Sequence, residues 1–261
     1  MAHNYLDRYL GGECEQVCAE LLALGPQVRH SPYIEPALAV CREMIRRSRV
    51  NLITLINRLV ELDHQFWCPA DPPHLAHISA DDPEQWNKLG VWVPPNEINT
   101  DTAGTLDRCE KNGVFIPLAV RVWMEEIGLV SLAGKHPTLC PFYDDWEHPA
   151  IYADPLEIQP VVDMVADRLQ QIASEDRLRI GFDQEEKSEM GIEPHYHQDS
   201  VYSISYPNAS VDVALNRAWF PTTFVGYLRK SFQWGGFPGW ERYANRPEKE
   251  LAFLREGLLP I

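Results

Sequence analysis

The clearest pattern of hydrophobic and polar positions runs from Asn112 to Gly134. Pro117 stands where a first helical turn tolerates a residue without an N–H. Apolar side chains follow at helical spacing with charged residues between them, which predicts a short amphipathic helix with Trp123 in the core. Its apolar positions are Leu118, Val122, Trp123 and Ile127. Gly128 occupies the usual place of a left-handed C-cap, and the apolar run at 129–133 predicts the start of a buried strand.

The pattern of the N-terminal region predicts helices. One helix spans residues 4–24, with Gly11-Gly12 as an interruption and Gly25-Pro26 as its end. A second helix ends in the basic cluster 46–49, and a third covers 50–63. Cations at a helix C-terminus interact favourably with the helix dipole, which explains the basic cluster, and an anion site is the alternative. Because each helix is too short to be stable alone, we expect them to pack on the rest of the chain.

Beyond a proline-rich connection at 68–83, the pattern predicts both helices and strands. Helices are expected at 102–111 and 224–232, and Thr222-Thr223 can cap the second of them. Alternation of apolar and polar residues predicts strands, which lie at 178–183, 201–206 and 211–215. Pro207-Asn208 offers a hairpin turn between the last two strands.

These elements divide the chain into a helical region at 1–75 and a mixed domain at 76–261. We therefore predict the α+β class, with an N-terminal helical bundle followed by a mostly antiparallel twisted sheet packed by helices.

The central stretch resembles the SUKH superfamily, the Smi/Knr-like proteins. The matching residues are Ile116, Pro117, Leu118, Trp123, Glu125, Glu126, Ile127, Gly128, Leu129 and Gly134. The Asp-Pro-Leu step at 154–156 and the closing helix at 224–232 are also similar, so the resemblance covers roughly residues 86–232. It implies the twisted sheet and a protein-binding role. Many bacterial members are immunity proteins that neutralise toxin domains, often nucleases, and fungal relatives are regulatory scaffolds. The helical preface and the glycine-rich tail at 234–241 depart from the family pattern.

The formal net charge of −15 makes sequence-independent binding to nucleic acid or to an anionic membrane unfavourable. The charge is uneven: residues 1–75 hold 7 basic and 9 acidic side chains, a balance of −2, and the remaining 16 and 29 give −13. Such an acidic domain suits a basic protein partner, with solubility alone as the alternative reading. The six cysteines form no C-x-x-C pair, and the acidic N-terminus does not resemble a signal peptide, so we expect a cytoplasmic protein with reduced thiols.

A loop of aromatic and acidic residues is the candidate partner-binding site. It comprises Tyr143, Asp144, Asp145, Trp146 and Glu147. Aromatic side chains anchor protein interfaces and carboxylates steer a basic partner, although a solvated loop with inward-facing aromatics would give the same sequence.

The sequence offers little for catalysis. His195 and His197 could share a metal with a carboxylate, but histidines at the entry to an edge strand are the simpler reading. No hydrolase signature, P-loop or dinucleotide motif is present. We therefore predict no cofactor, no metal and no enzymatic activity. The expected function is that of an immunity protein that occludes a basic toxin domain. The alternatives are a metal-dependent hydrolase that uses His195 and His197, or a regulatory scaffold. The oligomeric state is not indicated.

Overall fold

The computed structural model of the chain describes residues 4–66, 102–111, 115–128, 130–132, 134–139, 155–158, 177–181, 201–205, 210–212, 214–215 and 222–261. The α-helices in this part of the chain are α1 (Tyr5–Leu10), α2 (Cys14–Ala23), α3 (Ile34–Glu61), α6 (Thr102–Lys111), α7 (Leu118–Glu126), α10 (Phe224–Gln233) and α11 (Glu248–Arg255). Two 3₁₀ helices, η1 (Gly25–Arg29) and η2 (Pro238–Arg242), complete the helical elements of these ranges.

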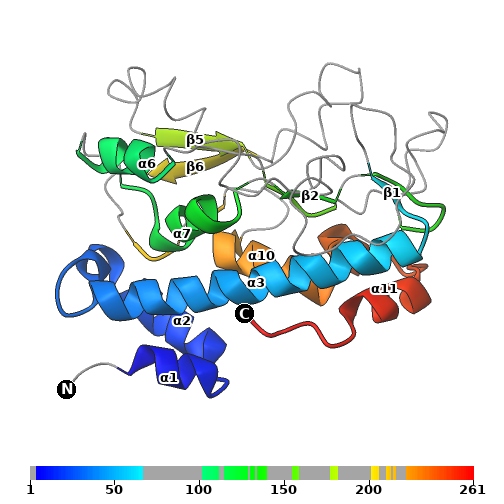
Figure 1. Cartoon of the computed structure of the whole chain (residues 1–261), viewed down its shortest axis with the longest axis horizontal. Helices are drawn as coiled ribbons and strands as arrows, with labels where there is room; N and C mark the ends of the chain where they lie inside the picture. Colours follow the sequence, from blue (N-terminus) through cyan, green and yellow to red (C-terminus); the bar gives the residue numbers. More distant parts are fainter. Residues whose placement is uncertain are drawn as a thin grey trace.

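The long helix α3 is the axis of the molecule (Figure 1). It was expected as two helices that meet near residue 49, and this expectation is wrong, because α3 continues for 28 residues from Ile34 to Glu61. The basic cluster 46–49 therefore lies in the middle of a helix, and the helix dipole does not explain it. Arginine is a good helix former, and Ser48 donates its hydroxyl to the Met44 carbonyl, so nothing in this cluster stops the helix.

The interruption between α1 and α2, the bounds of α6 and the start of α10 follow from local chemistry as predicted. Gly12, at φ +102°, interrupts the first helical stretch between α1 and α2, and Gly25 ends it at φ +54°. α6 has the predicted bounds. α10 begins after Thr223, whose hydroxyl oxygen accepts the Gly226 N–H at 3.0 Å, so this predicted cap is confirmed.

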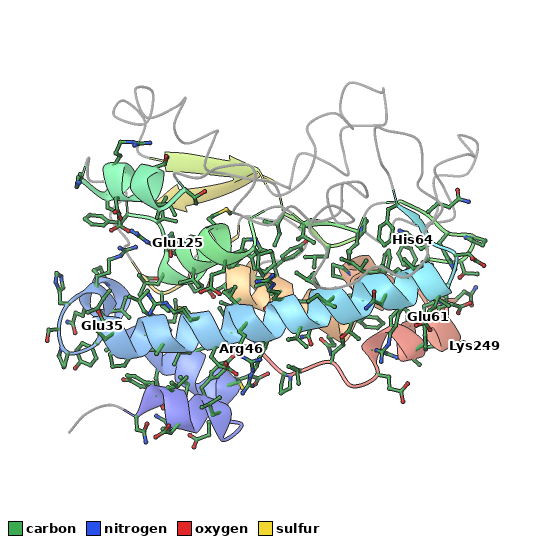
Figure 2. The ribbon with its side chains drawn as sticks, viewed as in Figure 1. Glu35, Arg46, Glu61, His64, Glu125 and Lys249 are labelled. Carbon is green, nitrogen blue, oxygen red and sulfur yellow. The ribbon has the colours of Figure 1, made fainter. Side chains whose placement is uncertain are left out.

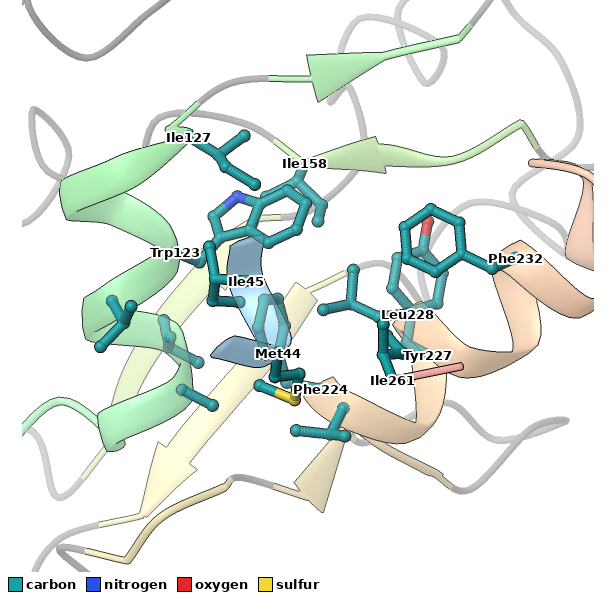
Figure 3. Packing of buried hydrophobic residues seen from close by; sticks show 14 of the residues in the cluster. Met44, Ile45, Trp123, Ile127, Ile158, Phe224, Tyr227, Leu228, Phe232 and Ile261 are labelled. Carbon is teal, nitrogen blue, oxygen red and sulfur yellow. The ribbon is translucent and has the colours of Figure 1, made fainter. Parts of the chain in front are cut away.

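Helix α7 confirms the prediction made from the central stretch. Pro117 precedes its first turn, and Gly128 adopts φ +75° just after its end. Trp123 is fully buried, donates its indole N–H to the Gly128 carbonyl at 2.8 Å, and meets the Phe224 ring edge to face at 5.7 Å. Figure 3 shows Trp123 beside Phe224 of α10 and Met44 of α3, so α7 joins both helices in the core.

The predicted α+β class is wrong. The described residues are dominated by helices, and their strands pair only two at a time, without a multi-stranded twisted sheet. The antiparallel pairs are β1 (Gln65–Phe66) with β3 (Gly134–Lys135), β2 (Val130–Ser131) with β4 (Glu157–Ile158), β5 (Arg177–Gly181) with β6 (Val201–Ser205), and β7 (Ala214–Leu215) with β8 (Thr222–Thr223). An alternating pattern indicates which face of a strand is buried but does not select its partner. The expected β6–β7 hairpin is accordingly replaced by pairing of β6 with β5 and of β7 with β8.

Hydrophobic residues from both ends of the chain form one core. Leu52 and Leu55 of α3 are fully buried in the same cluster as Trp123, Phe224 and Leu254. The predicted boundary between 1–75 and 76–261 lies outside the described residues and stays a prediction. The helices before it nevertheless bury their apolar faces against helices that follow it.

Side chains of α3 also hold the C-terminal tail, residues 254–261, in an arrangement that we call the C-terminal clamp. Arg47 Nη1 donates to the Pro260 carbonyl at 2.9 Å. Asn51 Nδ2 donates to the Leu259 carbonyl at 2.9 Å and Asn51 Oδ1 accepts the Leu259 N–H at 2.7 Å. Arg58 Nη1 donates to the Leu254 carbonyl at 3.1 Å. The clamp residues Arg47, Asn51 and Arg58 recur at near-helical spacing, so one stripe of α3 binds the whole tail.

Candidate functional site

The residues chosen from the sequence as functional lie outside the described part of the chain. This applies to the partner-binding loop from Tyr143 to Glu147 and to the histidine pair, His195 and His197. Their roles therefore stay predictions. The candidate sites below come from the described residues alone.

An open groove of about 720 Å³ lies where the start of α2, helix α10 and the C-terminal tail meet. Its lining residues are Gly12, Glu13, Cys14, Glu15, Gln16, Arg229, Phe232, Gln233, Arg255, Leu258, Leu259, Pro260 and Ile261. Three segments far apart in the sequence thus build the groove, and the C-terminal clamp fixes one of its walls on α3. The groove is open to solvent.

The arginines of the groove are engaged in holding the fold. Arg229 Nε donates to the Ile261 carbonyl at 2.6 Å, and Arg229 Nη2 donates to the Cys14 carbonyl at 3.2 Å. Arg255 Nε donates to the Leu251 carbonyl at 3.1 Å, and Arg255 Nη2 forms an ion pair with Glu248. These guanidinium groups therefore tie α10 and α11 to neighbouring backbone.

The rim of the groove on the α2 side is acidic. Glu13 and Glu20 share the single guanidinium of Arg8, at 2.9 Å and 2.7 Å. Glu15 is exposed and has no ion pair within the part of the chain that the structure describes. Of these carboxylates, Glu13 and Glu15 line the groove, whereas Glu20 lies outside its lining. Leu259 adds an exposed apolar side chain, 36% accessible, on the opposite wall. A basic segment with an apolar side chain would be complementary to this rim.

A small buried cavity of about 20 Å³ lies between α2, α3 and α10, lined by the thiols of Cys18 and Cys41 and by Asp212. Burial raises the pKa of both thiols, so they stay protonated and unreactive near neutral pH. Asp212 Oδ1 accepts the Val225 N–H at 3.2 Å in the first turn of α10. The cavity belongs to the core and offers no activated nucleophile.

Two buried histidines, His64 and His136, lie near the far end of α3 (His64 is labelled in Figure 2). Their ring centroids are 6.3 Å apart. His64 Nε2 bonds to the Leu132 carbonyl at 3.2 Å, and burial lowers the pKa of His64 to about 4. Burial also lowers the pKa of His136. Neither His64 nor His136 is predicted as a site residue from the sequence.

The described residues contain no cluster of three or more His, Cys, Asp or Glu side chains with the arrangement of a metal site. In the same ranges, no helix combines the length and the apolar character needed to cross a bilayer. α3 has the length, but arginines recur along it.

Comparison with known proteins identifies no relative of this chain. No protein-family model matches the chain, and no curated protein or solved structure matches it. The resemblance to the SUKH superfamily therefore stays a prediction from the sequence.

Proposed function

We propose that this chain is a non-enzymatic protein-binding module of the immunity type, which neutralises a basic toxin domain by covering it. The proposal extends the sequence resemblance to the SUKH superfamily and the balance of −13 in residues 76–261. An acidic surface steers a basic partner toward the complex and competes with the phosphates that a nuclease would bind. The protein would act in the cytoplasm, where such a toxin meets its substrate.

The observation that carries the proposal is the open groove with its acidic rim. On the α2 side of the groove, Glu13 pairs with Arg8, whereas Glu15 is exposed and has no ion pair among the described residues, so Glu15 is the carboxylate there that a basic partner can reach. A catalytic pocket needs an activated nucleophile or base beside its substrate, whereas Cys14 in the groove donates its thiol to the Tyr9 carbonyl at 3.4 Å. The groove is thus suited to binding.

The predicted anchor of the interface is the loop Tyr143–Glu147, with Trp146 as the aromatic hot spot. The groove is a second contact surface on the same protein. Truncation of a hot-spot aromatic typically costs 2 kcal/mol or more in binding, mainly through a faster off-rate. Loss of a rim carboxylate typically lowers the on-rate instead.

The test is a kinetic binding series against the product of the neighbouring gene, at about 0.05 M and about 0.3 M salt. Wild-type association should slow at the higher salt, Trp146→Ala should dissociate faster, and Glu15→Gln should associate more slowly. Glu61→Gln is the matched control, because it removes the same charge from an exposed position at the far end of α3 (Figure 2).

Two results would contradict the proposal. Failure of the chain to bind or neutralise the neighbouring product would remove the immunity role. Binding that is indifferent to salt and equal in Glu15→Gln and Glu61→Gln would mean that neither the acidity nor the groove contributes to recognition.

A further inference from the structure

The rings of His64 and His136 lie close together beside the β1–β3 pair. His64 follows α3, and its Nε2 bonds to the Leu132 carbonyl of the segment that leads into β3. His136 follows β3, and its ring lies near the Leu62 carbonyl at the end of α3. Both histidines flank the β1–β3 pair, in which Gln65 is opposite Lys135 and Phe66 is opposite Gly134. We call His64, His136 and this strand pair the histidine latch.

The bonds fix the proton of each ring. A carbonyl oxygen only accepts, so His64 carries its proton on Nε2 and leaves Nδ1 as a lone pair. His136 Nδ1 accepts two backbone N–H groups, from Thr138 at 3.2 Å and from Leu139 at 3.1 Å, so Nδ1 is unprotonated. The proton of the His136 ring therefore lies on Nε2, and this imidazole is neutral. Burial lowers the pKa of His64 to about 4, so this imidazole is neutral near pH 7 as well.

Among the described residues, a second proton on His64 finds no partner. His64 is 3% exposed, and its Nδ1 has no hydrogen-bond partner among the described residues. The rings of Phe66 and Phe237 meet it edge to face, at 4.7 Å and 6.1 Å. The backbone of β3 also packs tightly against His64. A Cβ added to Gly134 would lie 2.5 Å from His64 Nε2 and would collide with the Gln65 carbonyl oxygen. A cation at Nδ1 would thus be buried among apolar rings.

We propose that the histidine latch is a pH-sensitive switch, in which protonation of His64 and His136 opens the β1–β3 pair and releases the Thr138 and Leu139 amides. Protonation of His136 Nδ1 converts the acceptor of these two amides into a donor that faces them. Protonation of His64 Nδ1 places an unpaired charge in the apolar pocket. Either event favours a conformation in which the ring reaches water.

The charged groups that face the latch set its range. His64 faces His136, and a charge on one ring opposes a charge on the other. His136 faces Glu250 of α11 and Asp63, whose carboxylates partly offset the effect of burial. The pKa of His64 is lowered from 6.5 to about 4. The open conformation binds more protons than the closed one between these values, so opening is favoured as pH falls below 6.5, by up to about tenfold per unit for this histidine.

The test is amide hydrogen exchange, resolved by residue, between about pH 7.5 and pH 4.5, corrected for the intrinsic pH dependence of exchange. In the wild type, the opening equilibrium at Thr138 and Leu139 should rise by about tenfold or more per unit below pH 6. Amides in the middle of α3, around Ile45, should keep their protection, which distinguishes the latch from global unfolding.

The double variant His64→Gln/His136→Asn removes the titration and keeps the bonds. The glutamine amide can donate to the Leu132 carbonyl, and the asparagine oxygen can accept the Thr138 and Leu139 amides in an Asx turn. Its latch amides should show no rise at low pH. His30→Asn removes an exposed histidine outside the latch and should leave the wild-type rise unchanged.

Protection of Thr138 and Leu139 that is equal at both ends of the pH range in the wild type would overturn the proposal, as would an unchanged rise in the double variant. If the double variant does not fold, imidazole ¹⁵N spectra of the wild type decide. They should place both protons on Nε2 at pH 7.5, and a proton on Nδ1 of either ring at that pH would refute the switch. None of these outcomes depends on the proposed partner.

Discussion

The C-terminal clamp and the histidine latch perform the same task with different chemistry. In each, side chains at or after α3 bind backbone carbonyls of a segment far along the chain, 213 residues away for Arg47 and 68 residues away for His64. The clamp uses guanidinium and amide groups, whose charge does not change between acidic and alkaline pH. The latch uses imidazoles, which can charge near neutral pH. Because only the imidazoles gain charge in this range, acidification should release the segment held by the latch while α3 keeps the segment held by the clamp.

The largest effect should come from Arg47→Met, which removes one of the two arginines of the clamp. Arg47 pairs with Glu43 at 2.8 Å, stacks over the Tyr9 ring at 4.9 Å and is only 11% exposed at its side chain. Its loss leaves the Pro260 carbonyl and part of the Glu43 charge without a partner. We expect a destabilisation of about 3 kcal/mol, measured by urea unfolding at neutral pH.

Acidification should open the latch at a higher pH than the one at which Glu43 loses its ion pairs. The depressed pKa of His64, about 4 against 6.5, means that stability is complete above pH 6.5 and is lost as pH falls toward 4, by about 2–3 kcal/mol. Arg46 and Arg47 lower the pKa of Glu43 from 4.5 to about 2, so its contribution is lost only between these values. Urea unfolding at stepped pH should show two separate declines. His64→Gln/His136→Asn should abolish the first and leave the second, and a single decline in both proteins would contradict this separation.

Asn51→Leu should have a smaller effect, about 1–2 kcal/mol. The variant loses both hydrogen bonds between Asn51 and the Leu259 backbone. Because Leu259 is exposed, water can hydrogen-bond to its backbone and offset part of the loss. The Leu259 amide should become unprotected in hydrogen exchange at every pH, while the latch amides keep their wild-type response. Thr54→Val on the same helix, which removes only a local bond to the Val50 carbonyl, should leave the Leu259 amide protected.

Arg46→Met should have the smallest effect, less than about 1 kcal/mol. Arg46 binds the same Glu43 carboxylate as Arg47, at 2.7 Å, but its side chain is 57% exposed and holds no other segment in the described structure. The comparison with Arg47→Met in the same urea series isolates the contribution of the clamp. Equal effects of the two substitutions would mean that Glu43 pairing, and not the tail, explains the stability.

Elements whose signals are local could be predicted from the sequence. Pro117 and Gly128 delimit α7, Thr223 caps α10, and Gly12 separates α1 from α2, because turns and caps depend on a few neighbouring residues. Gly235 and Gly236 pack closely against the core, since a Cβ at these positions would lie 2.7 Å from Leu254 Cβ and 2.6 Å from Leu132 Cδ1.

Elements that depend on distant partners could not be predicted. Arg47 and Asn51 resemble exposed polar positions, and only the C-terminal tail explains why both are buried inside a continuous α3. The pairing partner of the strand at 201–205 could not be predicted, because alternation of apolar and polar residues carries no information on the neighbouring strand. The groove combines three segments whose proximity no local pattern indicates, and His64 has no sequence signal beyond its residue type.

The central claim is that α3 holds both ends of the chain in one core. The direct measurement is cleavage at a specific protease site inserted between Cys68 and Pro83, followed by size-exclusion chromatography and urea unfolding of the product. The account predicts that the two fragments elute together and unfold in a single transition, which Arg47→Met shifts to lower urea concentration. Two fragments that separate without denaturant and are each soluble and folded would contradict it.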